Sequence, residues 1–187
     1  MHELLQPDLL KKRLAASLFS SHIHYQVSID STNALAKRLA GQGAPEGTLV
    51  ITEEQTAGRG RRGRSWVSPP GANLIFSVLL RPPMDGDRVF VLTMVLALAG
   101  LKAVKRVAGV EAMIKWPNDL YVGKRKLAGI LTEVSLKEKR VEWAVPGMGM
   151  NVGCHPEVPE RGSAPATCLL EETGQRVSRN DLLIEIL

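Results

Sequence analysis

The chain has 187 residues, of which 44% are hydrophobic, 23% charged and 4% aromatic, and its net charge is +5. This length and composition are typical of one folded domain, and they exclude a disordered chain and a disulfide-stabilised miniprotein. The positive charge favours an anionic partner without distinguishing nucleic acid, phosphate or carboxylate.

In the first half of the chain, hydrophobic spacing and capping residues predict three helices and three strands. In order, they are a helix over residues 9–18, a strand over 24–28, a helix capped by Asp30 and Ser31 that ends at Gly41, strands over 48–52 and 73–80, and a helix over 89–107. A long loop rich in glycine and arginine joins the last two strands. The apolar run at 89–101 indicates that the third helix is buried.

The second half is predicted to be mostly strands. They span residues 112–115, 120–122, 126–134, 141–145 and 148–152, and helices follow over 167–172 and from a capping box at 178–181. Short turns join the first three strands, which predicts an antiparallel meander. A polar, proline-rich loop is expected over 156–165.

Cysteine content and hydropathy bear on the cellular location. Cys154 and Cys168 form no Cys-x-x-Cys pair, so we expect neither a zinc site nor a disulfide framework, and a reducing compartment fits best. The longest apolar run is shorter than the ~18 residues of a membrane span. The first residues also lack the features of a signal peptide. We therefore expect a cytoplasmic protein with no membrane partner.

The segment at 58–64 holds four arginines and three glycines. Its glycines match G-x-G-x-x-G formally, but that dinucleotide fingerprint requires a helix to begin there, and the prolines within 65–71 forbid one. A solvated basic loop, a nucleic-acid contact and a flexible loop that closes on a phosphate all remain open. The low aromatic content disfavours a base-stacking surface, and the glycines let backbone N–H groups face one small anion.

Lys126 lies among apolar residues of a predicted strand, so its ammonium must reach the sheet edge or a buried counter-charge. A snorkelling lysine is the ordinary alternative. Gly129 stands in mid-strand, where glycine is costly unless something approaches the backbone closely. The glycines within residues 147–151 repeat this pattern on the next strand. Together these features predict a ligand slot.

Five segments resemble, in order and spacing, the biotin protein ligases. They are Asp-Ser-Thr-Asn at 30–33, Gln-Thr-Ala-Gly-Arg-Gly-Arg-Arg-Gly-Arg-Ser-Trp at 55–66, Lys-Trp-Pro-Asn-Asp at 115–119, Arg-Lys-Leu-Ala-Gly-Ile-Leu at 125–131 and Gly-Met-Asn-Val at 149–152. The resemblance covers about residues 25–187. It implies an α/β catalytic domain of the α+β type, with a mixed, largely antiparallel sheet backed by helices, related to class II aminoacyl-tRNA synthetases.

The resemblance also implies an activity. Members of this family activate biotin with ATP to biotinyl-5'-AMP and transfer biotin to a lysine of a biotin carboxyl carrier protein. Members that also repress transcription carry an N-terminal winged helix, and only about 25 residues precede the first segment here. We therefore expect one catalytic domain over residues 1–187, no DNA partner and no small C-terminal β domain. A homodimer is compatible with the family.

The resemblance assigns roles to individual residues. Those implied to bind biotin are Ser31, Thr32, Asn33, Gln55, Arg59, Gly60, Arg61, Lys126 and Gly129. Those implied to bind ATP are Arg61, Lys115, Asn118 and Asn151. The first four are expected at or near the ureido head of biotin, and Lys126 is expected at its carboxylate. The tryptophan that stacks on adenine in some members is replaced by Pro165, so no residue is assigned that role.

The implied reaction joins two anions, the biotin carboxylate and the α-phosphate of ATP. We expect Lys126, Arg61 and Lys115 to offset their repulsion together with Mg²⁺, for which no protein ligand is assigned. In the second step the acceptor lysine, with a pKa of ~10.4, must lose a proton. Asp119 is the candidate base, and a turn aspartate that bonds its own backbone is the alternative.

Two other functions stay open at this point. The first is a lipoate-protein ligase, a related domain that uses the same adenylation chemistry, although its Arg-Ser-Gly-Gly-Gly type of loop is missing here. The second is a nucleic-acid-binding module that uses the arginines at 59–64. Oligonucleotide binding with a steep salt dependence, unaffected by biotin, would favour that module.

Overall fold

The computed structural model describes residues 4–156 and 165–187. Its strands are β1 (Ile23–Ile29), β2 (Leu49–Gln55), β3 (Leu74–Val78), β4 (Met113–Lys115), β5 (Asp119–Val122), β6 (Arg125–Lys137) and β7 (Arg140–Met150). Its helices are α1 (Pro7–Arg13), α2 (Thr32–Gly41), α3 (Phe90–Ala108), α4 (Leu169–Thr173) and α5 (Arg179–Ile186), with short 3-10 turns at Arg61–Gly63 and Gly86–Arg88.

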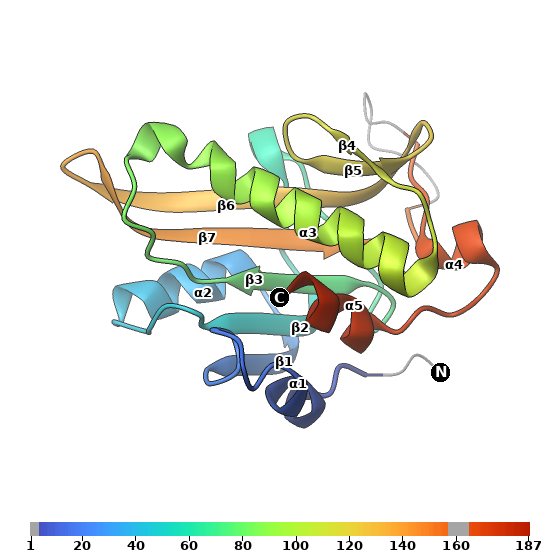
Figure 1. The fold of residues 1–187 in the computed structure, drawn as a ribbon, viewed down its shortest axis with the longest axis horizontal. Helices are drawn as coiled ribbons and strands as arrows, with labels where there is room; N and C mark the ends of the chain where they lie inside the picture. The colour runs from blue at the N-terminus through green and yellow to red at the C-terminus, as the bar shows by residue number, and fades with distance from the viewer. Residues whose placement is uncertain (1–3, 157–164) are drawn as a thin grey trace.

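One seven-stranded sheet, in the order β1-β2-β3-β7-β6-β5-β4, forms the centre of the fold (Figure 1). β1 pairs with β2 in parallel, and the other neighbouring strands pair antiparallel. The predicted fold class, a mixed and largely antiparallel sheet backed by helices, is confirmed. The meander of β4, β5 and β6 is also present.

The two faces of the sheet are covered differently. Because successive strand residues point to opposite faces, Leu49 and Phe76 join a large core with α1, α3 and α5, of which α3 and α5 cross in front of the sheet in Figure 1. Val50 and Val145 point the other way and pack with Ala36 of α2 in a smaller cluster. The short α2 covers only part of this second face.

Two predicted strands, over 141–145 and 148–152, are in fact one strand, β7. Pro146 and Gly147 favoured a break between them. The ladder nevertheless continues on both sides of Pro146, because Ala144 exchanges hydrogen bonds with Leu80 and Gly147 pairs with Ser77 of β3. The proline therefore interrupts one position of the ladder and not the strand. The loop expected over 156–165 lies almost entirely outside the described residues.

The apolar helix α3 is less buried than its sequence suggested. Phe90, Val95 and Leu98 are 62%, 58% and 50% exposed, because only one side of the helix faces the sheet. Within residues 4–156 and 165–187, no helix is long and apolar enough to cross a membrane.

Candidate active site

A cavity of about 660 Å³ brings together segments from distant parts of the chain. Its wall includes the start of α2, the end of β2, the loop at 59–67, the turn at 116–119 and the glycine-bearing parts of β6 and β7. Every residue predicted to bind biotin lines it, as do Asn118, Asp119 and Asn151. Lys115 does not.

Lys115 lies just outside this wall. Its side chain is exposed, and its ammonium is 4.5 Å from the ring centre of Tyr121 and 3.4 Å from the Tyr121 hydroxyl. Tyr121 itself lines the cavity. The lysine is therefore separated from the cavity by one aromatic side chain.

The polar end of the cavity is built where α2 begins. Ser31 caps the helix, since its side chain accepts a hydrogen bond from the backbone N–H of Ala34. Gln55, at the end of β2, accepts through Oε1 from the backbone N–H of Thr32 at 2.8 Å and lies 3.1 Å from the Thr32 hydroxyl. These bonds tie the end of β2 to the first turn of α2.

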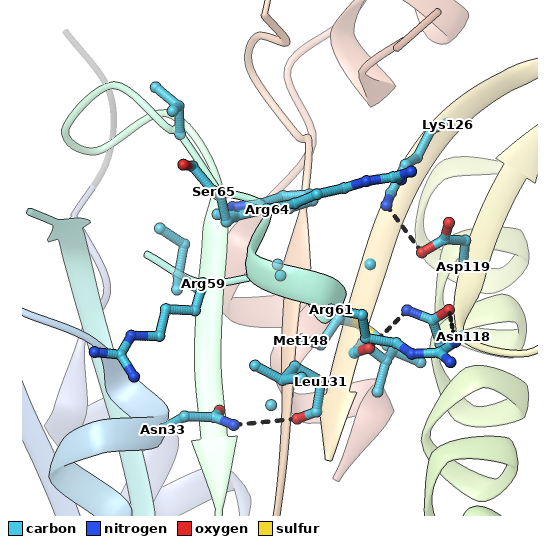
Figure 2. Close-up of a pocket in the computed structure, with 18 of the residues that line it drawn as sticks. Asn33, Arg59, Arg61, Arg64, Ser65, Asn118, Asp119, Lys126, Leu131 and Met148 are labelled. Atoms are coloured by element: carbon cyan, nitrogen blue, oxygen red, sulfur yellow. Dashed lines mark hydrogen bonds and ion pairs between the residues drawn. The ribbon is translucent and has the colours of Figure 1, made fainter. Parts of the chain in front are cut away.

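Asn33 crosses from α2 to the far strands. Its Nδ2 donates to the carbonyl of Leu131 at 3.1 Å (Figure 2) and to Oε2 of Glu133 at 3.0 Å. Its Oδ1 lies 2.6 Å from Oγ of the buried Ser77. A Cβ atom at Gly147 would approach that Oδ1 to 2.0 Å, so only glycine fits there.

Neither Ser77 nor Glu133 was identified from the sequence. Ser77 is a fully buried polar residue within the apolar strand β3, and this irregularity was the only signal available for it. Glu133 lies at an ordinary position of β6, where an acidic residue on a strand carries no signal of its own.

The cationic end of the cavity contains an ion pair. Nζ of Lys126 lies 2.9 Å from Oδ1 of Asp119, and both side chains face each other across the strands (Figure 2). The two side chains are 28% and 20% exposed. The sequence left two environments open for the Lys126 ammonium, the sheet edge or a buried counter-charge. The structure shows the second, because the ammonium is partly buried and paired with a carboxylate.

One asparagine, Asn118, connects the arginine loop to β6 by hydrogen bonds. Nη1 of Arg61 donates to Oδ1 of Asn118 at 2.8 Å, and Nδ2 of Asn118 donates to the carbonyl of Ile130 at 2.9 Å (Figure 2). Arg59 points away from this cluster in the same view. Asn118 thus links the loop to β6.

The predicted ligand slot over the strand glycines holds the indole of Trp66. Gly129 and Gly149 are register partners on β6 and β7, and a Cβ atom at Gly149 would lie 2.3 Å from the indole. The Lys126 ammonium is 5.9 Å from the ring centre. The glycines accommodate a protein side chain that walls the cavity, so the slot as first predicted needs this correction.

A second cavity of about 870 Å³ is also lined by the arginine loop. Residues 59–62 and 64–65 of the loop, the turn at 116–118 and Leu131 line both cavities. The second cavity adds Phe90 and Glu133. The loop therefore contributes to the walls of both cavities.

Comparison with known proteins identifies the family. The model of the Biotin/lipoate A/B protein ligase family matches residues 25–151. The bifunctional ligase/repressor BirA of Bacillus subtilis (strain 168) is 37% identical over 175 residues, which are 93% of this chain and 54% of that protein. The biotin--[acetyl-CoA-carboxylase] ligase of Paracoccus denitrificans is 39% identical over 158 residues, 82% of this chain and 65% of that protein.

A solved structure agrees with these matches. The biotin protein ligase from Aquifex aeolicus in complex with biotin and ATP aligns with a TM-score of 0.72 and 32% identity, over 89% of this chain and 67% of that one. The chain spans about half the length of the BirA relative. The resemblance inferred from five segments is confirmed, and the chain belongs to the biotin/lipoate A/B protein ligase family.

Proposed function

We propose that this chain converts biotin and ATP to biotinyl-5'-AMP and transfers biotin to a specific lysine of a biotin carboxyl carrier protein. The main support is that one cavity is lined by every residue predicted to bind biotin and by all but one of those predicted to bind ATP. Relatives named as biotin ligases, and a similar structure in complex with both substrates, support the same reaction.

The two ends of the cavity suit the two ends of biotin. Thr32 and Gln55 offer hydrogen-bonding groups to the ureido head, and Ser31 and Asn33 line the same end of the cavity. Lys126 offers its ammonium to the carboxylate, which would compete with Asp119 for it. A fixed cation at the place where two anions meet lowers the barrier because it needs no reorganisation when the reaction occurs.

Bond changes follow in two steps. A carboxylate oxygen of biotin attacks the α-phosphorus of ATP and pyrophosphate leaves, with Arg61 beside the phosphate. The acceptor lysine then attacks the acyl carbon, an amide bond forms and AMP leaves. Asp119 takes the proton of the lysine. Lys115, behind Tyr121, stays a proposed nucleotide contact that acts at longer range.

One oxygen atom on this wall suits Mg²⁺. Oδ1 of Asn151, a residue that lines the cavity, is buried and has no hydrogen-bond partner among the described residues. Mg²⁺ prefers such oxygen ligands together with substrate phosphates. Bound there, the ion would neutralise phosphate charge, and Asn151 would hold it together with the phosphates of ATP.

The remaining proposals concern the surroundings of the reaction. They are a cytoplasmic location, one catalytic domain over residues 1–187, no DNA partner, and a homodimer as the assembly to test by light scattering.

The activity is tested with the purified chain, biotin, ATP and Mg²⁺. Mass spectrometry under non-denaturing conditions should detect retained biotinyl-5'-AMP, pyrophosphate should be released, and an apo carrier domain should gain one biotin. Lipoate replaces biotin in a parallel reaction. Activity with lipoate alone would reassign the substrate, and the absence of pyrophosphate release with either acid would contradict the proposal.

A further inference from the structure

A continuous chain of polar side chains connects the second cavity with the polar end of the first. Lys37 forms an ion pair with Glu133, which lines the second cavity. The other carboxylate oxygen of Glu133 accepts from Nδ2 of Asn33, which lines the first. Ser77 lies 2.6 Å from Oδ1 of Asn33 and 2.8 Å from Oγ1 of Thr32.

The amide of Asn33 has one acceptable orientation. Its Nδ2 faces three acceptors: the Glu133 carboxylate at 3.0 Å, the Leu131 carbonyl at 3.1 Å and the Val145 carbonyl at 3.4 Å. A flipped amide would place an oxygen against all three. The bond to Glu133 is the strongest of them because its acceptor is charged. Oδ1 of Asn33 must therefore face Ser77.

This orientation decides where two hydroxyl protons go. A serine hydroxyl has one proton to donate. Because the amide oxygen of Asn33 can only accept, the short contact requires the fully buried Ser77 to donate its proton to Oδ1 of Asn33. The proton of Thr32 must then point to Ser77 or to Oε1 of Gln55, both of which are protein atoms. In either case Thr32 presents only lone pairs to the cavity.

We propose that Glu133 is a positioning residue for the ligand head group. It fixes the amide of Asn33 and, through Ser77, makes Thr32 an acceptor for an N–H group. This inference rests on the proposed function, since the ureido head of biotin carries N–H donors. Glu133 itself touches no substrate in this arrangement.

The test replaces Glu133 by glutamine, which keeps the shape and removes the charge. A glutamine has one oxygen, so it cannot accept from both Lys37 and Asn33. Biotin affinity measured by calorimetry should fall about tenfold or more, the range expected for a hydrogen bond to a charged group. KM for biotin should rise by the same factor, whereas kcat and KM for ATP stay within about twofold.

Lys37→Met is the matched control. It breaks the ion pair and leaves the Glu133 carboxylate facing Asn33, so biotin affinity should remain near that of the unmodified chain. In Glu133→Gln, the affinity for dethiobiotin, which keeps the ureido group and lacks the sulfur, should fall by the same factor as the affinity for biotin. If Lys37→Met lost as much biotin affinity as Glu133→Gln, the inference would be overturned. A loss of affinity for biotin that dethiobiotin does not share would also overturn it.

A double-mutant cycle with Ser77→Ala tests the connection itself. Since both residues act on Asn33, the losses of Glu133→Gln and Ser77→Ala should be less than additive. Additive losses would overturn the inference. If Glu133→Gln fails to fold in a thermal melt, Ser77→Ala still tests the chain, because it removes the donor to Asn33 without changing charge, and an unchanged biotin affinity would overturn it.

The experiments distinguish a failure of the role proposed for Glu133 from a failure of the proposed function. Unchanged biotin affinity in Glu133→Gln overturns the role of Glu133 and leaves the proposed function intact. No biotin binding by the unmodified chain overturns both.

Discussion

Two ion pairs, each with a carboxylate on a strand of this sheet, differ in their surroundings. Arg179 of α5 donates to Glu53 of β2 at 2.7 Å, and their side chains are 6% and 1% exposed. Lys126 and Asp119 are 2.9 Å apart in the wall of the first cavity and are 28% and 20% exposed. The first pair is sealed within the core face, whereas the second opens on a cavity.

The sealed pair has its partners within the protein. Glu53 also accepts from the backbone N–H of Leu5 and from the hydroxyl of Tyr25, and Arg179 also donates to the carbonyl of Asn73. Burial raises the pKa of the Tyr25 phenol, and the Glu53 carboxylate raises this pKa further. A network whose hydrogen bonds are made within the protein stabilises the fold and is not arranged to bind a ligand.

The cavity pair has incomplete surroundings. Trp66 and Asn151 line the same cavity, and within the described part of the chain Nε1 of Trp66 and Oδ1 of Asn151 are buried without a hydrogen-bond partner. Buried polar atoms without partners are costly, so a site retains them where a ligand supplies the missing bond. The difference between the pairs separates residues that stabilise the fold from residues available for binding.

The largest expected effect comes from breaking the cavity pair. Lys126→Met should reduce adenylate formation about 10³-fold, because it removes the cation at the biotin carboxylate. The melting temperature should change little, since both groups are partly exposed. Pyrophosphate release and thermal melting measure the two quantities. Release at the rate of the unmodified chain would remove Lys126 from the site.

Breaking the sealed pair should do the reverse. Arg179→Met leaves Glu53 buried without its counter-charge and should lower the free energy of unfolding by about 3–5 kcal/mol. Adding Glu53→Gln should recover part of this loss. Arg106→Met is the control, because the pair of Arg106 with Glu185 is exposed and should contribute below about 1 kcal/mol. Urea denaturation measures all three variants.

Asp119→Asn should separate the two chemical steps. Adenylate should still form, whereas transfer to the carrier lysine should slow about 10²-fold, because an amide cannot accept the proton. Raising the pH from about 7 to 9 increases the neutral fraction of a lysine with a pKa of ~10.4 by nearly a hundredfold, so the variant should recover relative to the unmodified chain. A constant ratio of transfer rates over this range would exclude Asp119 as the base.

The smallest effect is expected at the glycine floor of the cavity. Gly149→Ala places a methyl group 2.3 Å from the Trp66 indole, so the indole must move. We expect about tenfold weaker biotin binding and a shift of tryptophan emission, in line with the usual cost of overpacking. Gly41→Ala, where no atom lies within 4 Å, is the matched control. An equal shift of tryptophan emission in Gly149→Ala and Gly41→Ala would contradict the role of Gly149 in seating the indole.

Local patterns predicted the fold well where the contacts are local. The meander from β4 to β6 has short turns, and the motif residues at 30–33 and 115–119 lie on the turns and caps that their sequence favours. No local pattern states that β3 pairs with β7, so Ser77 could not be placed beside Asn33. The Arg179–Glu53 pair, which spans 126 positions, was missed for the same reason.

Trp66 shows a different limit. Glycines on two adjacent strands predicted a close approach to the backbone correctly, but they could not say which group approaches. The indole comes from a loop that is distant from both strands in sequence, and its place depends on how that loop crosses the sheet. Sequence patterns therefore singled out many of the residues that line the first cavity, whereas tertiary packing decided which side chains complete its wall.

The strand order also has a consequence for biosynthesis. The sheet consists of two halves, β1 to β3 and β4 to β7, which are joined by the pairing of β3 with β7. A nascent chain that has not yet reached Met150 leaves β3 as an unpaired apolar edge, which favours aggregation. Ser77 lies on β3 and Asn33 on α2, which connects β1 with β2, whereas Glu133 and Gly147 lie on β6 and β7. The first cavity therefore forms only when synthesis has passed β7, as a late event in the folding of this chain.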